Sequence, residues 1–536
     1  MPSATYVLEV DWANDGFAGG SGGRYFAARH FSARHFSARY FGGAGGGGGG
    51  IDDISTYVIA LSYSRGRDYA SQLTGRASAG QLEAELINTD GRFSSFLTTG
   101  PLYGNLVPAR KVRLRTTSPA AYTLWSGVVD SIEPLPAHGG LNTAKLHAVG
   151  PLVWLTEHTV EVAMQTSILT GAAIGLVLDE CDWPTADRTI DTGQTTMTRW
   201  WKDEVTGLFA AVQVADTDPG YLGESADGKI VFEDRLHRLI TPHTTSQATF
   251  TDAAGAGVLR YEGIRQLNPL ADIYNVIEAR VRIYTTGALA VLWTLAETAA
   301  SSPVLTPGQS RSFWATYPNP DSATNASAVD AWTTPVVTTD YLANSQADGL
   351  GSNLSGSVSV AVSKFATSMK ITLTNAAAVD AYITFLQARG TPITADDPVK
   401  VVSEDATSQA AYGRRSYEHQ SPFLPSTLLA QNWCDLTRSI FKDPIPILTI
   451  AMLANRSSDQ LTEVLTLDVS DRITLVATGT ETLLGINEEF FIEAMRHSVS
   501  RDGLHRVSYD ISPAAGYSGF WVLGTSLFGT TTKLMF

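Results

Sequence analysis

The sequence predicts a mainly β protein with a smaller α+β part, in which the β portion forms two antiparallel β-barrels and an inserted β-sandwich. Segments in which β-branched and aromatic residues alternate with polar ones recur along most of the chain. Gly, Pro and Asn-Thr-Asp-Gly turn signals separate these segments. Helical spacing of apolar residues occurs near 170–212 and 426–440. With 536 residues, the chain is too long for a single core.

The first barrel-like domain is expected over residues 1–155. Its predicted strands alternate in polarity and are bounded by turn residues, a pattern typical of a compact antiparallel sheet. These strands are Tyr6 to Trp12, Ile54 to Tyr63, Gln81 to Ile87, Lys111 to Arg115, Tyr122 to Asp130 and Leu141 to Val149.

A basic aromatic repeat lies in a glycine-flanked loop at residues 17–50, between the first two of these strands. Four near-copies of a five-residue unit keep Arg and Phe in strict register, and a glycine run follows them as a hinge. A period of five turns each successive Arg by roughly 140° on a helix and changes its face on a strand, so neither element makes the repeat amphipathic. We therefore expect contacts outside the segment from Arg24, Phe26, Arg29, Phe31, Arg34, Phe36, Arg39 and Phe41.

The residue types of this pentad loop allow three interpretations. The favoured one is that symmetry-related copies pack together in an assembly, or that the segment has no fixed structure. The second is contact with a bilayer interface, to which Arg and aromatic side chains are suited. The third is contact with nucleic acid, because Arg engages phosphate and aromatic rings stack on bases.

A small α+β domain is expected over residues 156–255. Thr170 is predicted to cap a helix that runs through Leu178. A second helix is indicated by the spacing of Val205, Leu208, Phe209 and Val212, and a strand by residues 229–233.

The second barrel-like domain is expected over residues 256–285 and 401–515, interrupted by a β-sandwich at 286–400. The alternation from Asn275 to Tyr284 is predicted to open this barrel. Near 426–440, Ser426 is predicted to cap a helix with a buried stripe, and Asp502-Gly503 to form a two-residue hairpin turn. The stripe comprises Leu429, Trp433, Leu436 and Ile440, and the hairpin directs Val507, Tyr509 and Ile511 to one face.

The composition indicates a protein that contacts other proteins. Charged residues make up 17% of the chain, below the roughly 25% that is usual, which suggests that much of its surface faces protein instead of water. The apolar extension at 516–536 is expected to dock on a partner or neighbouring subunit, with Trp521 and Phe536 as contact residues. A net charge of −15 argues against non-specific nucleic-acid binding by the bulk of the chain.

The compartment is expected to be reducing. Two cysteines far apart in sequence argue against a disulfide framework. The first ten residues already have the pattern of a strand, so no secretory signal is expected, and no apolar run is long enough to span a bilayer.

The sequence predicts no enzyme, and no catalytic, cofactor-binding or metal-binding residue. The glycine run at 45–50 lacks the Lys and Ser or Thr of a phosphate-binding loop. His237 and His243 are interpreted as ordinary surface histidines, and residues 216–220 as a turn instead of a calcium loop. The acidic residues near Cys181 are interpreted as a helix C-terminus, with paired carboxylates for hydrolysis as the alternative; they are Asp179, Glu180 and Asp182.

Several short motifs follow one another in a fixed order along the chain. The first domain carries Asn88-Thr-Asp-Gly-Arg-Phe93, Gly100-Pro-Leu-Tyr-Gly104, Pro108-Ala-Arg-Lys-Val112 and Leu124-Trp-Ser-Gly-Val-Val-Asp130. They are followed by Gly228-Lys-Ile-Val-Phe-Glu233, and then by Phe491-Ile-Glu493 with His497 and Asp502-Gly-Leu-His505. In this order the motifs resemble those of tailed-phage baseplate hub or tail-tip hub proteins. Ala109 stands where the family pattern has Gly, and Trp125 where it has Phe.

The resemblance implies a structural protein of the virion, synthesised in the host cytoplasm and assembled into the tail tip or baseplate. It implies two tail-tube-like barrels per subunit and a homotrimer that adapts the sixfold tail tube or distal tail ring to threefold tip components. Implied partners are the tape-measure protein, fibre or spike proteins and, through the pentad loop, the host envelope during attachment and genome ejection.

Two other function classes stay open from the residues. In the first, the inserted sandwich binds a receptor or carbohydrate through Trp293, Trp314 and Trp332. In the second, a cell-wall hydrolase uses the acidic residues near Cys181.

Overall fold

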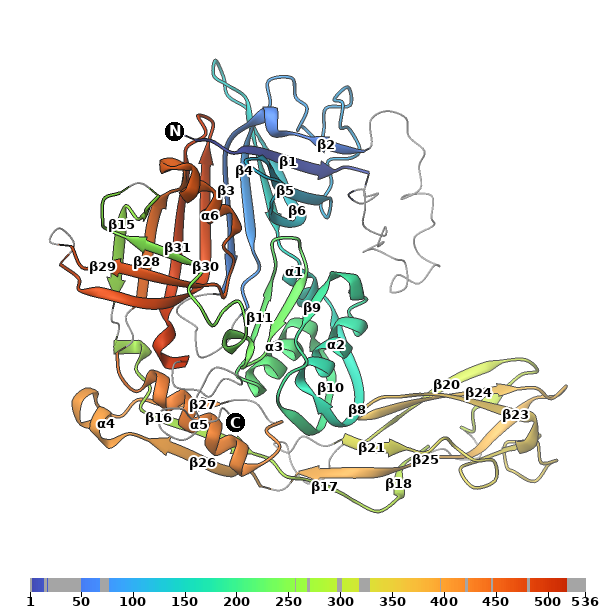
Figure 1. Cartoon of the computed structure of the whole chain (residues 1–536). Coiled ribbons are helices and arrows are strands. Elements are labelled where there is room, and N and C mark those ends of the chain that lie inside the picture. The colour runs from blue at the N-terminus through green and yellow to red at the C-terminus, as the bar shows by residue number, and fades with distance from the viewer. Residues whose placement is uncertain are drawn as a thin grey trace.

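The computed structural model describes residues 2–13, 17, 50–67, 77–255, 257–267, 270–295, 301–317, 328–395, 397–419, 423–444, 447–479 and 483–517. The architecture is mainly β, as the sequence predicts. Figure 1 shows a large sheet, a compact α+β unit beside it, and an elongated arm that extends away from both.

The first half of the large sheet is antiparallel throughout. Its strands follow the order β3-β4-β7-β6-β5-β1-β2. Alternate residues point into the core because successive side chains of a strand face opposite sides, as the buried Leu82, Ala84 and Leu86 of one strand illustrate. The strands are β1 Thr5–Asp11, β2 Ile51–Asp53, β3 Val58–Gly66, β4 Gln81–Ile87, β5 Lys111–Ser118, β6 Thr123–Leu135 and β7 Thr143–Val149.

The second half of the large sheet comes mostly from the C-terminal part of the chain. β30 pairs with β29 and β31, and these continue to β13 and β14 on one side and to β28 and β15 on the other. The strands are β13 Ala248–Thr251, β14 Leu259–Arg260, β15 Gly263–Leu267, β28 Ile447–Leu453, β29 Arg472–Ala477, β30 Ile486–Ser500 and β31 His505–Pro513, and the helix α6 is Ser458–Thr466.

The two halves form one continuous sheet, because β3 pairs antiparallel with β30 from Ala60 opposite Ser500 to Gly66 opposite Ala494. One hydrophobic core spans both halves and includes Leu8, Trp125, Phe250 and Tyr509. The prediction of two barrels is therefore corrected. Among the described strands neither half closes on itself, since the edges of β3 and β30 are used to join the halves.

The hairpin of β30 and β31 confirms the predicted face, since Val507, Tyr509 and Ile511 are all buried. Its turn is longer than predicted. Ser500 N donates to Leu504 O at 3.0 Å and Gly503 N donates to Ser500 O at 2.9 Å, so a loop of three residues, 501–503, lies between the hydrogen-bonded Ser500 and Leu504. Gly503 has a φ of +79°, the left-handed conformation that a three-residue hairpin loop requires.

The α+β unit packs two longer helices and one short helix against two small sheets. β8 pairs with β10, and the second sheet has the order β11-β12-β9. Thr206 caps α3 by accepting a hydrogen bond from Phe209 N at 3.3 Å. Thr170, the predicted cap of the other helix, is instead its first residue. The elements are α1 Leu152–Glu157, β8 Thr159–Leu169, α2 Thr170–Glu180, β9 Arg188–Ile190, β10 Thr196–Thr206, α3 Gly207–Thr217, β11 Tyr221–Glu224 and β12 Ile230–Glu233.

A separate three-stranded sheet holds the segment that was expected to open the second barrel. Its order is β26-β16-β27, outside the large sheet, and its own core forms against α5. Ser426 caps α5 as predicted, with Leu429 N donating to Ser426 Oγ at 3.2 Å. The buried stripe is shifted to Ala430, Trp433, Cys434 and Thr437. The elements are β16 Val276–Val281, β26 Val399–Glu404, α4 Ala406–Tyr412, β27 Ser416–His419 and α5 Thr427–Phe441.

The arm comprises the described residues between 284 and 395, and two sheets enclose its own core. In the larger sheet the 15-residue strand β25 pairs with five others, and the smaller sheet has the order β20-β24-β23. The strands are β17 Tyr284–Thr286, β18 Ala290–Thr294, β19 Val304–Leu305, β20 Ser310–Thr316, β21 Ala328–Trp332, β22 Tyr341–Asn344, β23 Val358–Lys364, β24 Ser368–Asn375 and β25 Ala381–Ala395.

Candidate functional site: a buried charge network at the sheet junction

The predicted contact residues lie outside the described part of the chain: Arg24, Phe26, Arg29, Phe31, Arg34, Phe36, Arg39, Phe41, Trp521 and Phe536. The strands that flank the pentad loop are described. β1 and β2 pair antiparallel with Asp11 opposite Ile51, so the loop connects two adjacent strands of one sheet. The second flanking strand was predicted at Ile54 to Tyr63, whereas the short β2 precedes that segment and β3 begins at Val58. Phe17 is the first residue of the pentad loop, and its ring centroid lies 4.2 Å from the Arg113 guanidinium carbon.

The described residues instead assemble a polar cluster where the two sheet halves meet the α+β unit. At its centre is Glu493 on β30, which is 3% exposed. Arg238, from the short helix η4 (His237–Leu239), binds Glu493 through two contacts of 2.7 and 3.0 Å. Arg67, which follows β3, lies 3.1 Å from the same carboxylate, and Ser512 Oγ donates to it at 2.6 Å.

These partners determine the charge of Glu493. Burial alone would raise the pKa of this carboxyl group, but Arg238 and Arg67, with the hydrogen bonds of Arg238 and Ser512, lower it to about 2. Glu493 is therefore ionised at neutral pH. A buried carboxylate between two guanidinium groups is stable only while the partners remain in place.

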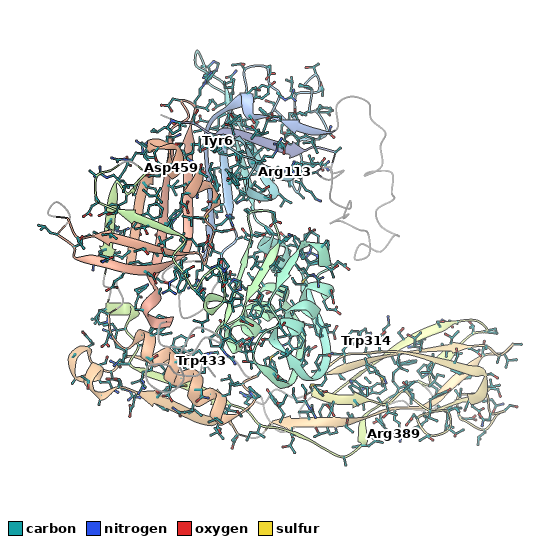
Figure 2. All side chains as sticks on the ribbon, in the orientation of Figure 1. Tyr6, Arg113, Trp314, Arg389, Trp433 and Asp459 are labelled. Atoms are coloured by element: carbon teal, nitrogen blue, oxygen red, sulfur yellow. The ribbon has the colours of Figure 1, made fainter. Side chains whose placement is uncertain are left out.

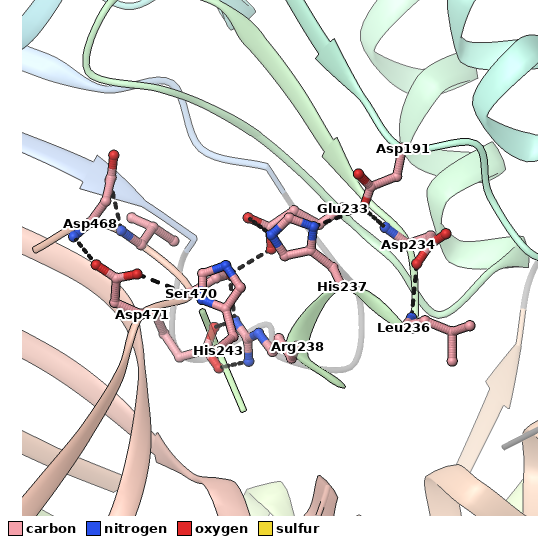
Figure 3. Close-up of polar contacts among 12 residues, drawn as sticks. Asp191, Glu233, Asp234, Leu236, His237, Arg238, His243, Asp468, Ser470 and Asp471 are labelled. Carbon is pink, nitrogen blue, oxygen red and sulfur yellow. Dashed lines mark hydrogen bonds and ion pairs between the residues drawn. The ribbon is translucent and has the colours of Figure 1, made fainter. Parts of the chain in front are cut away.

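Glu233 and His237 extend the cluster into the α+β unit, as Figure 3 shows. Ser470 Oγ donates to Glu233 Oε2 at 2.5 Å. The His237 ring lies 2.8 Å from Asp191 through Nδ1 and 3.6 Å from Glu233 through Nε2. Burial lowers the pKa of His237, but Asp191 and Glu233 outweigh it and raise this pKa above its usual value. We name Arg67, Glu233, His237, Arg238, Ser470, Glu493 and Ser512 the junction network.

His243 lies beside the junction network, and its pKa is shifted in the direction opposite to that of His237. Its ring centroid is 4.9 Å from that of His237. Burial and then the charges of His237 and Arg238 lower the pKa of His243 to about 4. The interpretation of both residues as surface histidines is therefore wrong, because their side chains are 20% and 11% exposed and belong to an interior contact.

Glu224 ties the α+β unit to the first sheet half at a second point. This buried residue at the end of β11 accepts hydrogen bonds from the backbone N–H groups of Gly80 and Leu152. Gly150 is required here, since an added Cβ would overlap the Glu224 carboxylate. Burial raises the pKa of Glu224 to about 7, against these hydrogen bonds and the charge of Arg65.

A histidine pair links the first strand to the C-terminal hairpin. Tyr6 Oη lies 2.7 Å from His505 Nδ1, and His505 Nε2 lies 3.0 Å from His497 Nδ1. Burial lowers the pKa of His505 to about 4. Burial, followed by the charges of His505 and Arg65, holds the pKa of His497 well below its usual value. Both rings are consequently neutral at pH 7.

Asp179 and Asp218, from the two acidic segments considered for catalysis and calcium binding, both have partners within the chain. Asp179 lies near the C-terminal end of α2, where it pairs with Arg188 at 2.7 Å. Asp218 is buried and accepts a hydrogen bond from Thr170 Oγ1 at 2.7 Å. Within the described residues, no group of three or more His, Cys, Asp and Glu side chains is placed to hold a metal ion. Among the described helices, none has the length and apolar character to cross a membrane.

Acidic residues of two family motifs meet at this junction. Glu233 ends one motif, and Glu493 belongs to another more than 250 residues later in the chain. Ser470 donates to Glu233, and Arg238 contacts both Ser470 and Glu493. The motifs by themselves do not predict that their acidic residues share a network. Arg67 and Arg238 were missed because no local pattern marks an arginine whose partner is distant in sequence.

The backbone at Ala109 explains why the family pattern has Gly at this position. Ala109 stands where the family pattern has Gly, and its φ is +63°, a conformation that is unfavourable for residues with a Cβ. Ala109 N donates to Val129 O at 2.7 Å, which holds this turn against β6. In the same domain Asn88 Oδ1 accepts from Phe93 N at 2.9 Å and fixes the Asn-Thr-Asp-Gly turn.

No protein-family model matches the chain, and no curated protein does either. Solved structures do match. The tail protein from Neisseria meningitidis is 9% identical, covers 95% of this chain and 96% of its own, and has a TM-score of 0.49. A 43 kDa prophage tail protein from Shewanella oneidensis is 9% identical, with coverages of 88% and 97% and a TM-score of 0.45.

A component of the type VI secretion system from E. coli, described as similar to T4 tail proteins, is 8% identical, covers 85% of this chain and 73% of its own, and has a TM-score of 0.36. Two of these three structures are named as tail proteins, and the third as similar to tail proteins. All three TM-scores are below 0.5, so the proposed function rests on this chain's own residues.

Proposed function

We propose that this chain is the structural hub of a phage tail tip or baseplate. The observation that carries the proposal is that the acidic residues of two of the ordered family motifs, Glu233 and Glu493, meet in one buried network. This network joins the α+β unit to the large sheet, and His497 stacks on Tyr63 where the two sheet halves meet.

The form of the large sheet supports a ring-building role. Each chain supplies two sheet halves that are joined edge to edge through β3 and β30. At the outer ends of this sheet, β2, β14 and β15 each pair with a single described strand. Unpaired strand edges are templates for another chain, and head-to-tail contacts between identical chains close into rings. Three chains with two halves each would match a sixfold tube.

In this proposal the homotrimer joins the tail tube or distal tail ring to threefold fibre or spike proteins and surrounds the end of the tape-measure protein. The division into 1–155, 156–255, 256–285 with 401–515, 286–400 and 516–536 belongs to the same proposal. The pentad loop then occurs three times near one axis, where it contacts the tape measure, the lumen or the host envelope.

Assembly tests the proposal. The purified chain is expected to form trimers in native mass spectrometry, and a particle lacking it is expected to have no complete tip in electron micrographs. A chain that stays monomeric at high concentration, together with intact tips in its absence, would contradict a hub role. Deleting 24–41 is expected to leave particles assembled but to impair DNA delivery, and normal infectivity would remove the pentad loop from the mechanism.

A further inference from the structure

The outward face of the small sheet in the arm has an unusual composition. β20, β24 and β23 alternate between a buried row, which includes Phe313, Ile371 and Val358, and an outward row. Of the eleven outward positions, eight carry a hydroxyl group and none carries a carboxylate. They are Ser310, Ser312, Trp314, Thr316, Ala361, Ser363, Ser359, Ser368, Lys370, Thr372 and Thr374.

Trp314 is the one aromatic residue of this face. Its side chain is 50% exposed, and Figure 2 shows it on the arm. The indole is held in place, because it stacks on Phe365 with ring centroids 5.8 Å apart and an interplanar angle of 23°. Lys370 Nζ lies 5.9 Å from the ring centroid. A fixed, half-exposed indole loses little conformational entropy when a ligand covers it.

The other two tryptophans of the predicted carbohydrate platform are placed differently. Trp332 is 5% exposed and donates from Nε1 to Phe365 O at 2.9 Å. Trp293 is half-buried and packs against the arm's core. Trp314 is therefore the tryptophan available to a ligand, and the prediction of a three-tryptophan platform is wrong.

The hydroxyl rows continue from Trp314 along the strands. Ser312 and Thr372 face each other with their oxygens 2.9 Å apart, and Ser310 and Thr374 do so at 2.7 Å. Successive rows lie about 7 Å apart, since a strand rises ~3.4 Å per residue and outward positions alternate. Each hydroxyl has one donor and two acceptor sites, so a paired hydroxyl can still bond a ligand.

We propose that this face binds a neutral polysaccharide, with Trp314 under the apolar face of one sugar ring and the Ser and Thr rows contacting its hydroxyl groups. A sugar offers both a C–H face and groups that donate and accept, which matches an aromatic ring bordered by hydroxyls. Nucleic acid would require several cations, whereas the outward rows carry only Lys370. The inference does not depend on the proposed hub function.

A glycan microarray of neutral hexose and N-acetylhexosamine oligosaccharides, probed with the full chain, tests the proposal. The best binder is then titrated by calorimetry. Trp314→Ala is expected to weaken binding about tenfold or more, and Thr372→Val about threefold to tenfold through loss of one hydroxyl. Leu350→Ala is the matched control, because Leu350 is 84% exposed elsewhere in the arm, and it should bind as the unchanged chain does.

Three outcomes would overturn the proposal. The first is that no neutral glycan binds at millimolar concentration. The second is that Trp314→Ala binds as tightly as the unchanged chain. The third is binding confined to anionic glycans and lost in Lys370→Ala. If Trp314→Ala leaves glycan binding unchanged, and particles assembled with this variant lack a protein that particles with the unchanged chain contain, the face is a protein contact instead.

Discussion

The large sheet and the arm are attached to the rest of the chain in different ways. The sheet halves and the α+β unit meet through buried, fully charged groups around Glu493. The arm meets the α+β unit through the buried Ala328 and Ala366, the edge-to-face contact of Tyr284 with Trp201, and polar contacts that are at least partly exposed. These polar contacts are the ion pair of Arg199 with Asp330 at 3.4 Å and the bond from Thr367 Oγ1 to Asp203 Oδ2 at 2.7 Å. A buried ion network fails as a whole when one member is removed, whereas an exposed bond contributes little. The sheet and the α+β unit should therefore unfold together, and the arm separately.

Removing the central charge of the junction network should have the largest effect. Glu493→Gln leaves Arg238 and Arg67 buried without their carboxylate. We call the large sheet and the α+β unit together the body, and we expect its free energy of unfolding to fall by about 3–5 kcal/mol. Calorimetry would measure this as a lower main transition. Asp179→Asn is the control, because its pair with Arg188 is 57% exposed on the Asp179 side, and it should change stability by less than ~1 kcal/mol. Equal effects of the two variants would contradict a special role for the junction.

Acidification should have the next largest effect, because it should destabilise the large sheet but not the arm. His505 has a pKa of about 4 in the folded chain against 6.5 ordinarily, so the unfolded state binds more protons between these pH values. Its contribution is complete above pH 6.5 and is lost as the pH falls toward 4, by up to ~3 kcal/mol. Residues 281–404 contain no histidine, so the arm should not share this loss.

Unfolding of His505→Gln between pH 4 and 7 checks this prediction. The variant should show a shallower pH dependence of the main transition than the unchanged chain. An unchanged slope would show that other groups, such as His243, are responsible for the acid sensitivity.

Within the arm, Asp340→Asn should act locally. Asp340 is 1% exposed and binds Arg389 through contacts of 2.6 and 2.8 Å; Figure 2 marks Arg389 on the arm. Loss of this charge-assisted pair should cost about 2 kcal/mol. Limited proteolysis should detect earlier cleavage of the arm while the main transition stays in place, with the exposed Asp380→Asn as control. A shift of the main transition would mean that arm and body unfold as one.

Ala109→Gly should stabilise the sheet. The φ of +63° at Ala109 costs a residue with a Cβ about 1 kcal/mol or more, and Gly adopts it freely. We expect a gain of ~1 kcal/mol in denaturant unfolding of the body. The same change at the exposed Ala120 should bring no gain. Destabilisation by Ala109→Gly would refute the account of strain at this turn.

The smallest effect is expected at the contact between arm and body. Thr367→Val removes the exposed bond to Asp203, and both transitions should move by less than ~0.5 kcal/mol. A double-mutant cycle with Asp203→Asn would measure the coupling directly. A coupling energy above 1 kcal/mol would show that the arm is held more firmly than its exposed contacts imply.

Local signals in the sequence predicted local structure well. Ser426 caps α5, and the alternation around Tyr509 places one face of the hairpin in the core. The predictions that failed concern partners. The segment from Asn275 to Tyr284 has the alternation of a strand, but alternation does not specify which sheet it joins, and β16 lies apart from the large sheet.

The sequence by itself determined the mainly β architecture, the helix cap, the hairpin and the order of the family motifs. Each of these depends on residues a few positions apart, whose propensities and hydrogen bonds act within one turn or strand. Only the tertiary structure decided that β3 pairs with β30, that Arg238 neutralises Glu493, and that Trp314 is exposed while Trp332 is buried. These contacts join residues far apart in the chain, and their energy comes from burial and charge pairing that exist only once the separate parts have packed.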